Sequence, residues 1–409
     1  MTPIERRATI ALAGIFSLRM LGLFMILPVF ALYANQLSGV TPTLVGLAIG
    51  AYGLTQAILQ IPFGVLSDHF GRKRIIAIGL LIFAGGSVVA ALSTSIWGVI
   101  FGRALQGAGA IAGPVMALAA DLTRDTQRTK AMAAIGMSIG LSFAIAIVAA
   151  PAIDHQIGVS GIFWLIGGLA MMGLVVLFFA VPTPIHSEVH RDAEAVPDQI
   201  KEVYRNLTLR RLDFSILSLH IILTANWVVM PLVLSDHLPR QHHWWVYLPV
   251  LLLSAAAMVP FIIMAERQRG RLKQIFLGAV ALLGSAELLL IPAHTNLWMT
   301  VGVLFLFFTA FNLLEAILPS LMSKLAPPEA KGTAMGIYST AQFLGAFIGG
   351  TLGGWIHGHF GISGVFLMGT ISAILWLLVA AGLQDLRILK SVRDNSFNAQ
   401  DDRELTAGN

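Results

Sequence analysis

The chain contains no cysteine. This absence excludes disulfide bonds, thiol catalysis and metal sites built from thiolates. A phosphate-binding loop of the form Gly-x-x-x-x-Gly-Lys-Ser/Thr is missing as well, so ATP hydrolysis is excluded as a driving reaction. Seven of the eleven histidines are scattered over four different loops, and no constellation of residues indicates an enzyme. We therefore expect no metal site, no cofactor and no catalytic residues.

Charged residues are scarce, at 11% of the chain against 56% hydrophobic residues. A soluble protein of 409 residues needs more polar surface than this, so the composition predicts a membrane protein with many spans. Runs of about 20 apolar residues can cross a hydrocarbon layer of about 30 Å, and they must be helical because lipid satisfies no backbone groups. Twelve such runs lie near 9–34, 43–66, 75–94, 97–120, 131–153, 161–182, 212–235, 244–265, 274–293, 297–323, 332–356 and 362–383.

The cations are distributed asymmetrically. All but three of the 26 Lys and Arg residues lie in the N-terminal flank, in loops that follow even-numbered spans, or in the C-terminal tail. Because cytoplasmic loops collect Lys and Arg, both termini are predicted to be cytoplasmic. The net charge of +5 then reflects membrane topology, and we expect no nucleic-acid partner. The three exceptions are Arg19, Arg103 and Arg240.

The apolar runs form two groups of six. Arg128-Thr-Lys-Ala-Met132, which enters the fifth span, matches Lys331-Gly-Thr-Ala-Met335, which enters the eleventh, and this similarity indicates two related halves. The predicted divisions are an N-terminal half at 1–182, a cytoplasmic linker at 183–211, a C-terminal half at 212–384 and a mobile cytoplasmic tail at 385–409.

The loop between the second and third spans carries the most specific motif, Gly64-Val-Leu-Ser-Asp68-His-Phe-Gly71-Arg72-Lys-Arg74. A tight hairpin with an acid, a turn glycine and three cations is costly beside lipid, so it belongs at the membrane surface. The motif resembles the corresponding loop of the major facilitator superfamily. The resemblance implies an all-α fold of twelve helices in two pseudo-symmetric halves.

The resemblance also implies roles for the residues of this loop. In the family, the acid that matches Asp68 lies against the start of the eleventh helix, here near 331–333, and the arginine that matches Arg72 pairs with an acid that matches Asp121. Both contacts belong to the outward-open state and break when the protein opens inward. Gly71 supplies the turn and Gly64 lets helices approach. We expect these five residues to form a conformational latch.

Two arginines lie inside predicted spans. Arg103, within Gly102-Arg-Ala-Leu-Gln-Gly-Ala-Gly109, resembles the superfamily's fourth-helix motif, whose arginine is linked to proton transfer; the alternative is that Arg103 snorkels outward. Arg19 is too deep for easy snorkelling. Its surroundings, Ser17-Leu-Arg-Met-Leu-Gly-Leu-Phe-Met-Ile-Leu-Pro28, resemble the YajR-like branch of the twelve-span drug:proton antiporters. This resemblance implies a multi-pass protein of a bacterial inner membrane.

The second half carries two acids and a histidine inside its predicted spans, in contrast to the two arginines of the first half. They are Glu315, Glu287 and His220. An acid inside the membrane pays a desolvation penalty when it is ionised, which is the property that a proton carrier needs. Glu315 is the predicted proton site and His220 an auxiliary titrating group, with Arg19 tuning the site, Arg103 assisting it and Glu287 as a further candidate for proton coupling. The alternative for Glu315 is a structural ion pair with Arg19. The alternative for Glu287 is that it is protonated and serves only in packing.

Polar residues inside the spans are candidates for the lining of a substrate cavity. They are Tyr52, Gln56, Gln60, Gln106, Asn226, Asn312, Tyr338 and Gln342. Glycines also recur every fourth residue in the eleventh span, in one row from Gly345 to Gly353 and in a parallel row at Gly350 and Gly354. Such rows predict close helix packing, with or without a role in gating.

These features predict a proton-coupled exporter of a small amphipathic organic compound that works by alternating access, driven by the proton gradient. Its partners are then the substrate, protons and the lipid bilayer, and we expect a monomer. One alternative is an importer of a sugar, metabolite or lipid precursor by symport or uniport. A second is a membrane sensor or scaffold that transports nothing.

Overall fold

The structure is a computed structural model that describes residues 1–183, 199–267, 271–327 and 330–383. In this part of the chain the regular elements are helices, apart from one isolated bridge between Ser38 and Ser95. The elements are α1 (Pro3–Met25), α2 (Phe30–Tyr33), η1 (Ala34–Gln36), α3 (Pro42–Phe70), α4 (Arg72–Leu92), α5 (Ile96–Ala108), α6 (Ala112–Asp121), α7 (Asp125–Phe179), α8 (Ile200–Arg205), α9 (Leu207–Ser235), η3 (Arg240–His242), α10 (Trp244–Arg267), α11 (Leu272–Ala293), α12 (Leu297–Leu325) and α13 (Lys331–Ala381).

The described residues contain ten helical segments that are long and apolar enough to cross a membrane. Two of them, α7 with 55 residues and α13 with 51, are far longer than one crossing of about 30 Å requires. Each is folded back at a glycine with positive φ, Gly158 (φ 68°) and Gly361 (φ 69°), a conformation that L side chains rarely adopt. The described residues therefore form twelve spans, which confirms the twelve predicted from the sequence.

Two of the predicted spans are interrupted. The first span consists of α1 and α2, and Pro28, which has no N–H to donate, lies in the gap between them. The fourth span consists of α5 and α6, and Gly109 begins its gap. Neither interruption shows in the hydropathy of the sequence, because both gaps are as apolar as the helices they separate.

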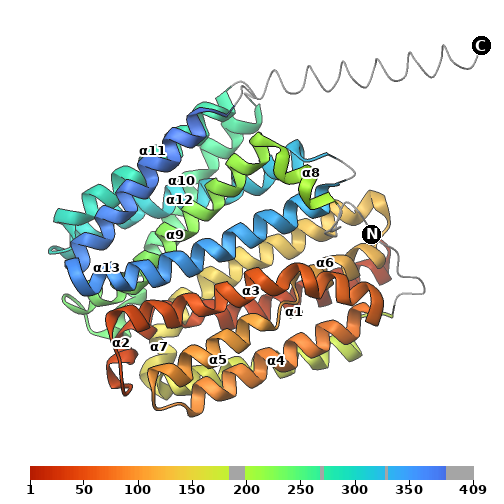
Figure 1. Ribbon diagram of the computed structural model, residues 1–409, viewed down its shortest axis with the longest axis horizontal. Helices are drawn as coiled ribbons and strands as arrows, with labels where there is room; N and C mark the ends of the chain where they lie inside the picture. The colour runs from red at the N-terminus through yellow and green to blue at the C-terminus, as the bar shows by residue number, and fades with distance from the viewer. Residues whose placement is uncertain (184–198, 268–270, 328–329, 384–409) are drawn as a thin grey trace, which may run out of the picture.

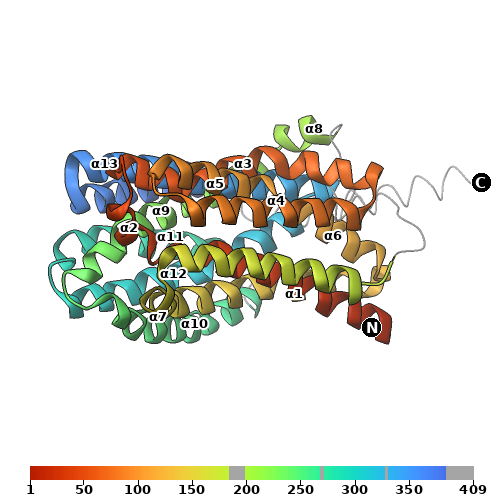
Figure 2. The same ribbon diagram turned by 90° about the horizontal axis from the view of Figure 1, so that it is seen from below.

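The helices lie side by side in two groups (Figure 1). The first six spans are coloured red to yellow-green and the last six green to blue, and Figure 2 shows the same bundle turned by 90°. Within the predicted linker, α8 is described and buries Val203. The other linker residues at 184–198, and the predicted tail at 385–409, lie outside the described residues.

Cations hold the ends of several helices together at one end of the bundle. Arg7 Nε donates to the carbonyl oxygen of Ala180 at 2.9 Å, and Arg211 donates to that of Gly382. Lys273 Nζ donates to that of Ala381 at 3.0 Å. Positive charge is favourable beside the free carbonyls at a helix C-terminus. We call this end, which holds residues 1–7, 180, 206–211 and 382, the linker end; the opposite end, with Gly158, Gly361 and η3, is the far end.

The two glycine rows of α13 pack against two different helices. A Cβ on Gly349 would collide with the carbonyl oxygen of Ile221 in α9, while a Cβ on Gly350 would lie 2.6 Å from the carbonyl oxygen of Gly46 in α3. The predicted close packing is confirmed. The rows bring the backbone of α13 into contact with α3 of one half and α9 of the other, so α13 lies at the boundary between the halves.

Candidate functional site

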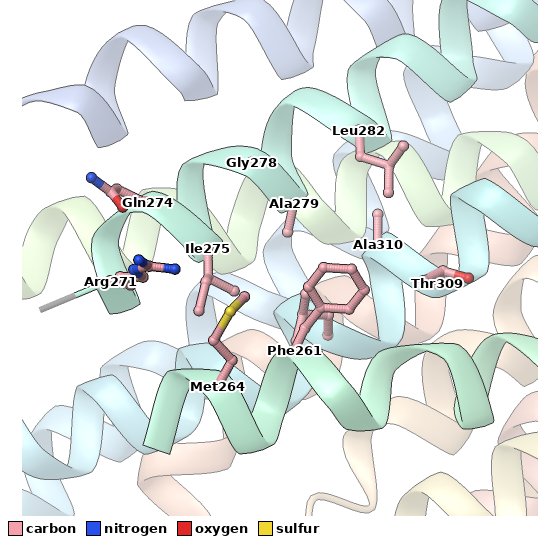
Figure 3. A pocket seen from close by; sticks show the side chains of 11 residues that line it. Phe261, Met264, Arg271, Gln274, Ile275, Gly278, Ala279, Leu282, Thr309 and Ala310 are labelled. Atoms are coloured by element: carbon pink, nitrogen blue, oxygen red, sulfur yellow. The ribbon is translucent and has the colours of Figure 1, made fainter. Parts of the chain in front are cut away.

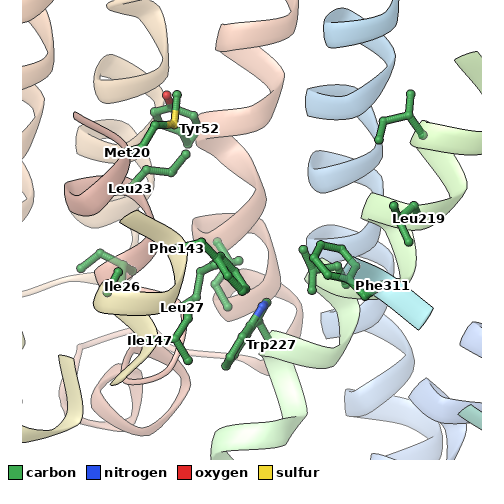
Figure 4. Close-up of a cluster of buried hydrophobic side chains, with 14 of the residues drawn as sticks. Met20, Leu23, Ile26, Leu27, Tyr52, Phe143, Ile147, Leu219, Trp227 and Phe311 are labelled. Atoms are coloured by element: carbon green, nitrogen blue, oxygen red, sulfur yellow. The ribbon is translucent and has the colours of Figure 1, made fainter. Parts of the chain in front are cut away.

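A group of aromatic side chains joins the two halves on the far-end side of their boundary (Figure 4). Phe143 of α7 lies 6.4 Å from Trp227 of α9 and 6.2 Å from Phe311 of α12, measured between ring centroids. Trp227 also lies 6.5 Å from Phe308, and Leu27 adds a buried aliphatic side chain. Trp227 is 2% exposed. The space between the halves is therefore covered from the far end.

Arg19 of α1 is fully buried in the N-terminal half. Its Nη2 donates to Gln56 Oε1 at 2.7 Å and to the carbonyl oxygen of Gly109 at 2.8 Å, at the interruption of the fourth span. The guanidinium carbon lies 5.5 Å from the centre of the Tyr52 ring and 5.4 Å from that of Phe83. Two of its nitrogens, Nε and Nη1, have no hydrogen-bond partner among the described residues.

Arg103 of α5 is the second buried arginine, at 1% exposure, so it does not snorkel outward. Its Nη1 donates to Gln106 Oε1 at 2.8 Å, and Gln106 Nε2 donates to Ser87 Oγ at 2.8 Å. Its guanidinium carbon lies 5.3 Å from the centre of the Tyr52 ring. The guanidinium groups of Arg19 and Arg103 thus both lie close to the Tyr52 ring, and the negative face of an aromatic ring attracts cations. In the described residues neither Arg19 nor Arg103 has a carboxylate partner.

Glu315, His220 and Gln342 meet in the C-terminal half although they come from three helices, α12, α9 and α13. Gln342 Nε2 lies 3.3 Å from Glu315 Oε1 and 2.9 Å from His220 Nε2. His220 Nδ1 lies 3.2 Å from the carbonyl oxygen of Ile216, and since a carbonyl only accepts, these contacts place the imidazole proton on Nδ1. Glu315 Oε2 and the Tyr338 hydroxyl have no described hydrogen-bond partner. The ion pair between Glu315 and Arg19 that the sequence left open is not formed among the described residues.

Glu287 lies apart from this group. It is fully buried, and its Oε1 accepts a hydrogen bond of 2.6 Å from Asn226 Nδ2. A Cβ on Gly369 of α13 would collide with Glu287 Oε2, so α13 packs directly on the carboxyl group. The structure therefore brings Asn226 together with Glu287, between α9, α11 and α13, and not with the other residues predicted for the cavity.

The remaining residues predicted for the cavity divide between the two halves. Asn312 Nδ2 donates to Ser254 Oγ of α10 at 3.1 Å, so Asn312 and Glu315, three residues apart on α12, contact different helices. Gln60 Nε2 donates across the boundary to the carbonyl oxygen of Gly336 at 3.2 Å. Gln342 and Asn312 are half-buried, whereas Gln60 is 5% exposed.

The residues of the predicted latch gather around Arg72 at the linker end. Arg72 is 2% exposed; it pairs with Asp68, and its Nε lies 3.4 Å from Asp121 Oδ2. Gly71 has φ 91° and forms the turn that precedes α4. The expected pair of Arg72 with Asp121 is thus present. The expected contact of Asp68 with 331–333 is not found among the described residues, and a Cβ on Gly64 would meet nothing within 4 Å.

Replacing Asp121 with asparagine is expected to destabilise this end of the protein. The Asp121 side chain is fully buried, so the change removes a charge that compensates a buried guanidinium, at a cost of about 2 kcal/mol while Asp68 remains. The apparent unfolding temperature of the purified protein should fall by about 2–5 °C. Asp68→Asn is the matched control and should cost less, because Asp68 is 21% exposed. Equal unfolding temperatures for wild type and Asp121→Asn would contradict this role.

Sequence reasoning missed Asp213 and the aromatic group. Asp213 lies near the start of α9, and its Oδ1 is buried without a described hydrogen-bond partner. Asp213 lies on α9 seven residues before His220, so the two side chains share one face of this helix about two turns apart. The sequence could have indicated Asp213 because it is an acid just inside the predicted seventh span. It follows Arg210 and Arg211 closely, so it looks like part of a charged flank.

Comparisons with known proteins agree with the fold. Residues 12–350 and 212–400 match the family description Major Facilitator Superfamily. The chain is 51% identical over 394 residues to the inner membrane transport protein YajR of Escherichia coli strain K12, with 96% of this chain and 87% of the relative covered.

Two solved structures share the fold at low sequence identity. A bacterial homologue of the human lysosomal transporter Spinster, in an inward-facing and occupied conformation, superposes with a TM-score of 0.76 at 14% identity, over 93% of this chain and 96% of that one. The human organic anion transporter MFSD10 (TETRAN) superposes with a TM-score of 0.67 at 19% identity, over 93% of this chain and 100% of that one.

Proposed function

The chain belongs to the Major Facilitator Superfamily and is a multi-pass transporter of the inner membrane, and from this premise we propose that it exports a small amphipathic organic compound in exchange for protons. In this proposal a proton binds and leaves Glu315 once in each cycle. The two halves expose the substrate site alternately to either side of the membrane. The proton gradient supplies the energy, and no cofactor takes part.

The observation that carries the proposal is the environment of the Glu315 carboxyl group. One oxygen faces the Gln342 amide at 3.3 Å, and the other is buried without a described partner. An ionised carboxylate is costly with so few donors, whereas the protonated acid is tolerated. His220 accepts a hydrogen bond from the same amide, so a change of charge on Glu315 reorganises a contact between α12, α13 and α9.

The conformation of the boundary supports alternating access. The aromatic group of Phe143, Trp227, Phe308 and Phe311 joins the halves on the far-end side. Asp68 pairs with Arg72, and within the described part of the chain it makes no ion pair with α13. If the linker end is cytoplasmic, as the distribution of cations predicts, this is an inward-facing arrangement in which the Asp68 contact of the latch is open while the pair of Arg72 with Asp121 is still formed. The outward-facing state would then bring Asp68 to the start of α13.

The chemistry of the lining supports an amphipathic substrate. The Phe311 ring lies 6.3 Å from the His220 ring, which is hydrogen-bonded to the half-buried amide of Gln342, so apolar surface adjoins a few hydrogen-bonding groups. Arg19 favours a second candidate, an amphipathic compound with an acidic group. Its two unpaired nitrogens leave buried positive charge uncompensated by any described carboxylate.

Proton flux in reconstituted vesicles tests the proposal. A pH gradient is imposed on vesicles that contain the protein, and a panel of lipophilic cations, neutral amphipaths and amphipathic acids is added. We expect at least one compound to dissipate the gradient in these vesicles and not in protein-free vesicles. Proton movement in the same direction as the substrate would indicate an importer by symport instead. A failure of every compound to move protons, together with no uptake of any of them, would favour the sensor or scaffold.

A further inference from the structure

A groove on the C-terminal half lies outside the proposed transport site. Helices α10 and α11 both pack against α12 but make little contact with each other, so α12 forms the floor of the space between them. The groove has a volume of about 490 Å³, within the range of about 300–1,000 Å³ that is typical of ligand sites. Figure 3 shows Phe261 and Met264 on one side, Ile275 and Leu282 on the other, and Ala310 between them.

The groove is apolar along its length and cationic at one mouth. Arg271 lies at the linker end of the groove, directly before α11, and the exposed Gln274 lies one turn further along. The Arg271 side chain is exposed, and none of the described residues pairs with it. From Arg271 to Leu282 the groove follows α11 for about 16 Å, which is roughly the hydrocarbon depth of one leaflet.

Gly278 keeps the middle of the groove open. A Cβ on Gly278 would meet no described atom within 4 Å, although this glycine lies on α11 between residues that line the groove. The glycines that bring helices together, such as Gly46 and Gly350, differ because a Cβ there would strike backbone atoms. A larger side chain at Gly278 would therefore take up part of the groove.

We propose that this groove binds one anionic phospholipid of the leaflet at the linker end. One acyl chain lies along Phe261, Met264 and Ile275, and the phosphate pairs with the guanidinium of Arg271. Charge complementarity selects this occupant, because a guanidinium at a membrane surface attracts anionic headgroups and pairs with phosphate through two parallel hydrogen bonds. The site is independent of the proposed transport function.

Native mass spectrometry of the purified full-length protein tests the site. The protein is titrated with phosphatidylglycerol and with phosphatidylcholine of identical acyl chains. We expect one phosphatidylglycerol to be retained about five- to tenfold more tightly than phosphatidylcholine. Arg271→Gln should remove this preference by weakening phosphatidylglycerol alone. Gly278→Leu should weaken both lipids, because it puts a side chain into the groove at a position where a Cβ meets no described atom within 4 Å.

Lys130→Gln is the matched control, since Lys130 is an exposed cation in the other half, near the linker-end start of α7. It should leave the binding of both lipids unchanged. Equal retention of the two lipids by wild type would overturn the proposal in favour of a nonselective annular lipid. If Lys130→Gln lost the preference for phosphatidylglycerol as fully as Arg271→Gln, the effect would be due to general surface charge. Unchanged binding of both lipids in Gly278→Leu would exclude the groove as the lipid-binding site.

Discussion

Replacing Glu315 with glutamine is expected to reduce proton-coupled transport to the level of protein-free vesicles while substrate binding stays within about threefold of wild type. Glutamine has nearly the same shape and still accepts the hydrogen bond that Gln342 donates to Oε1 at 3.3 Å, but it has no titratable proton. The substitution therefore affects proton exchange alone. The measurement pairs substrate-dependent dissipation of a pH gradient with equilibrium binding of the same substrate to the purified variant.

Glu287→Gln is the matched control for this prediction. It removes a carboxyl group from the same half of the protein, but Glu287 is fully buried against Asn226 and α13, away from Glu315 and His220. We expect the control to retain most of the proton flux. If Glu287→Gln abolished flux and Glu315→Gln did not, the proton site would have to be assigned to Glu287. If Glu315→Gln retained full flux, proton coupling through Glu315 would be wrong.

The twelve spans were predictable because hydropathy records which segments face lipid, and this requirement acts on each segment separately. The interruptions near Pro28 and at Gly109 were not, since an apolar residue looks the same in a helix and in a break. The turns at Gly158 and Gly361 fall where the predicted spans separate, but the sequence does not reveal that the backbone there has positive φ in the midst of helical residues.

The candidate site was predictable in its members and not in its pairing. Arg19, Glu315 and Glu287 stand out because a charge inside a span is costly and therefore rare. Their partners depend on which helices are neighbours and how each is rotated, and no single segment records that. Thus Arg19 contacts Gln56 and a backbone carbonyl where an acid was one alternative, and Asn226 contacts Glu287.

The same distinction applies to the glycine rows of α13. Their spacing predicted a closely packed face, because glycines four residues apart lie on one side of a helix. The partners follow only from the fold. In it α3 packs against Gly350 and Gly354, while α9 packs against Gly345, Gly349 and Gly353. A helix that meets both halves through smooth backbone surfaces can slide on either of them, and this is where gating is most easily blocked.

Gly46→Leu is expected to abolish nearly all transport by preventing closure at the far end. A Cβ at Gly46 would collide with the carbonyl oxygen of Gly350 and lie 2.8 Å from Gly354 Cα, and these are backbone atoms that cannot rotate away. The overlap costs about 1–3 kcal/mol if the boundary stays closed, so we expect α3 and α13 to separate. Because the chain has no cysteine, an introduced Leu27→Cys reports this separation without background. Its labelling by a membrane-impermeant thiol reagent added from the far-end side should increase strongly.

Gly302→Leu provides the control, because a Cβ on this membrane-span glycine meets no described atom within 4 Å. It adds the same side chain to α12 without touching the boundary, so transport and the labelling of the introduced cysteine should match the parent protein. The two variants separate a block of the boundary from a general intolerance of leucine at glycine positions. If Gly46→Leu transported normally, or lost transport with no increase in labelling, the close contact of α3 with α13 would not be the surface on which the far end opens and closes.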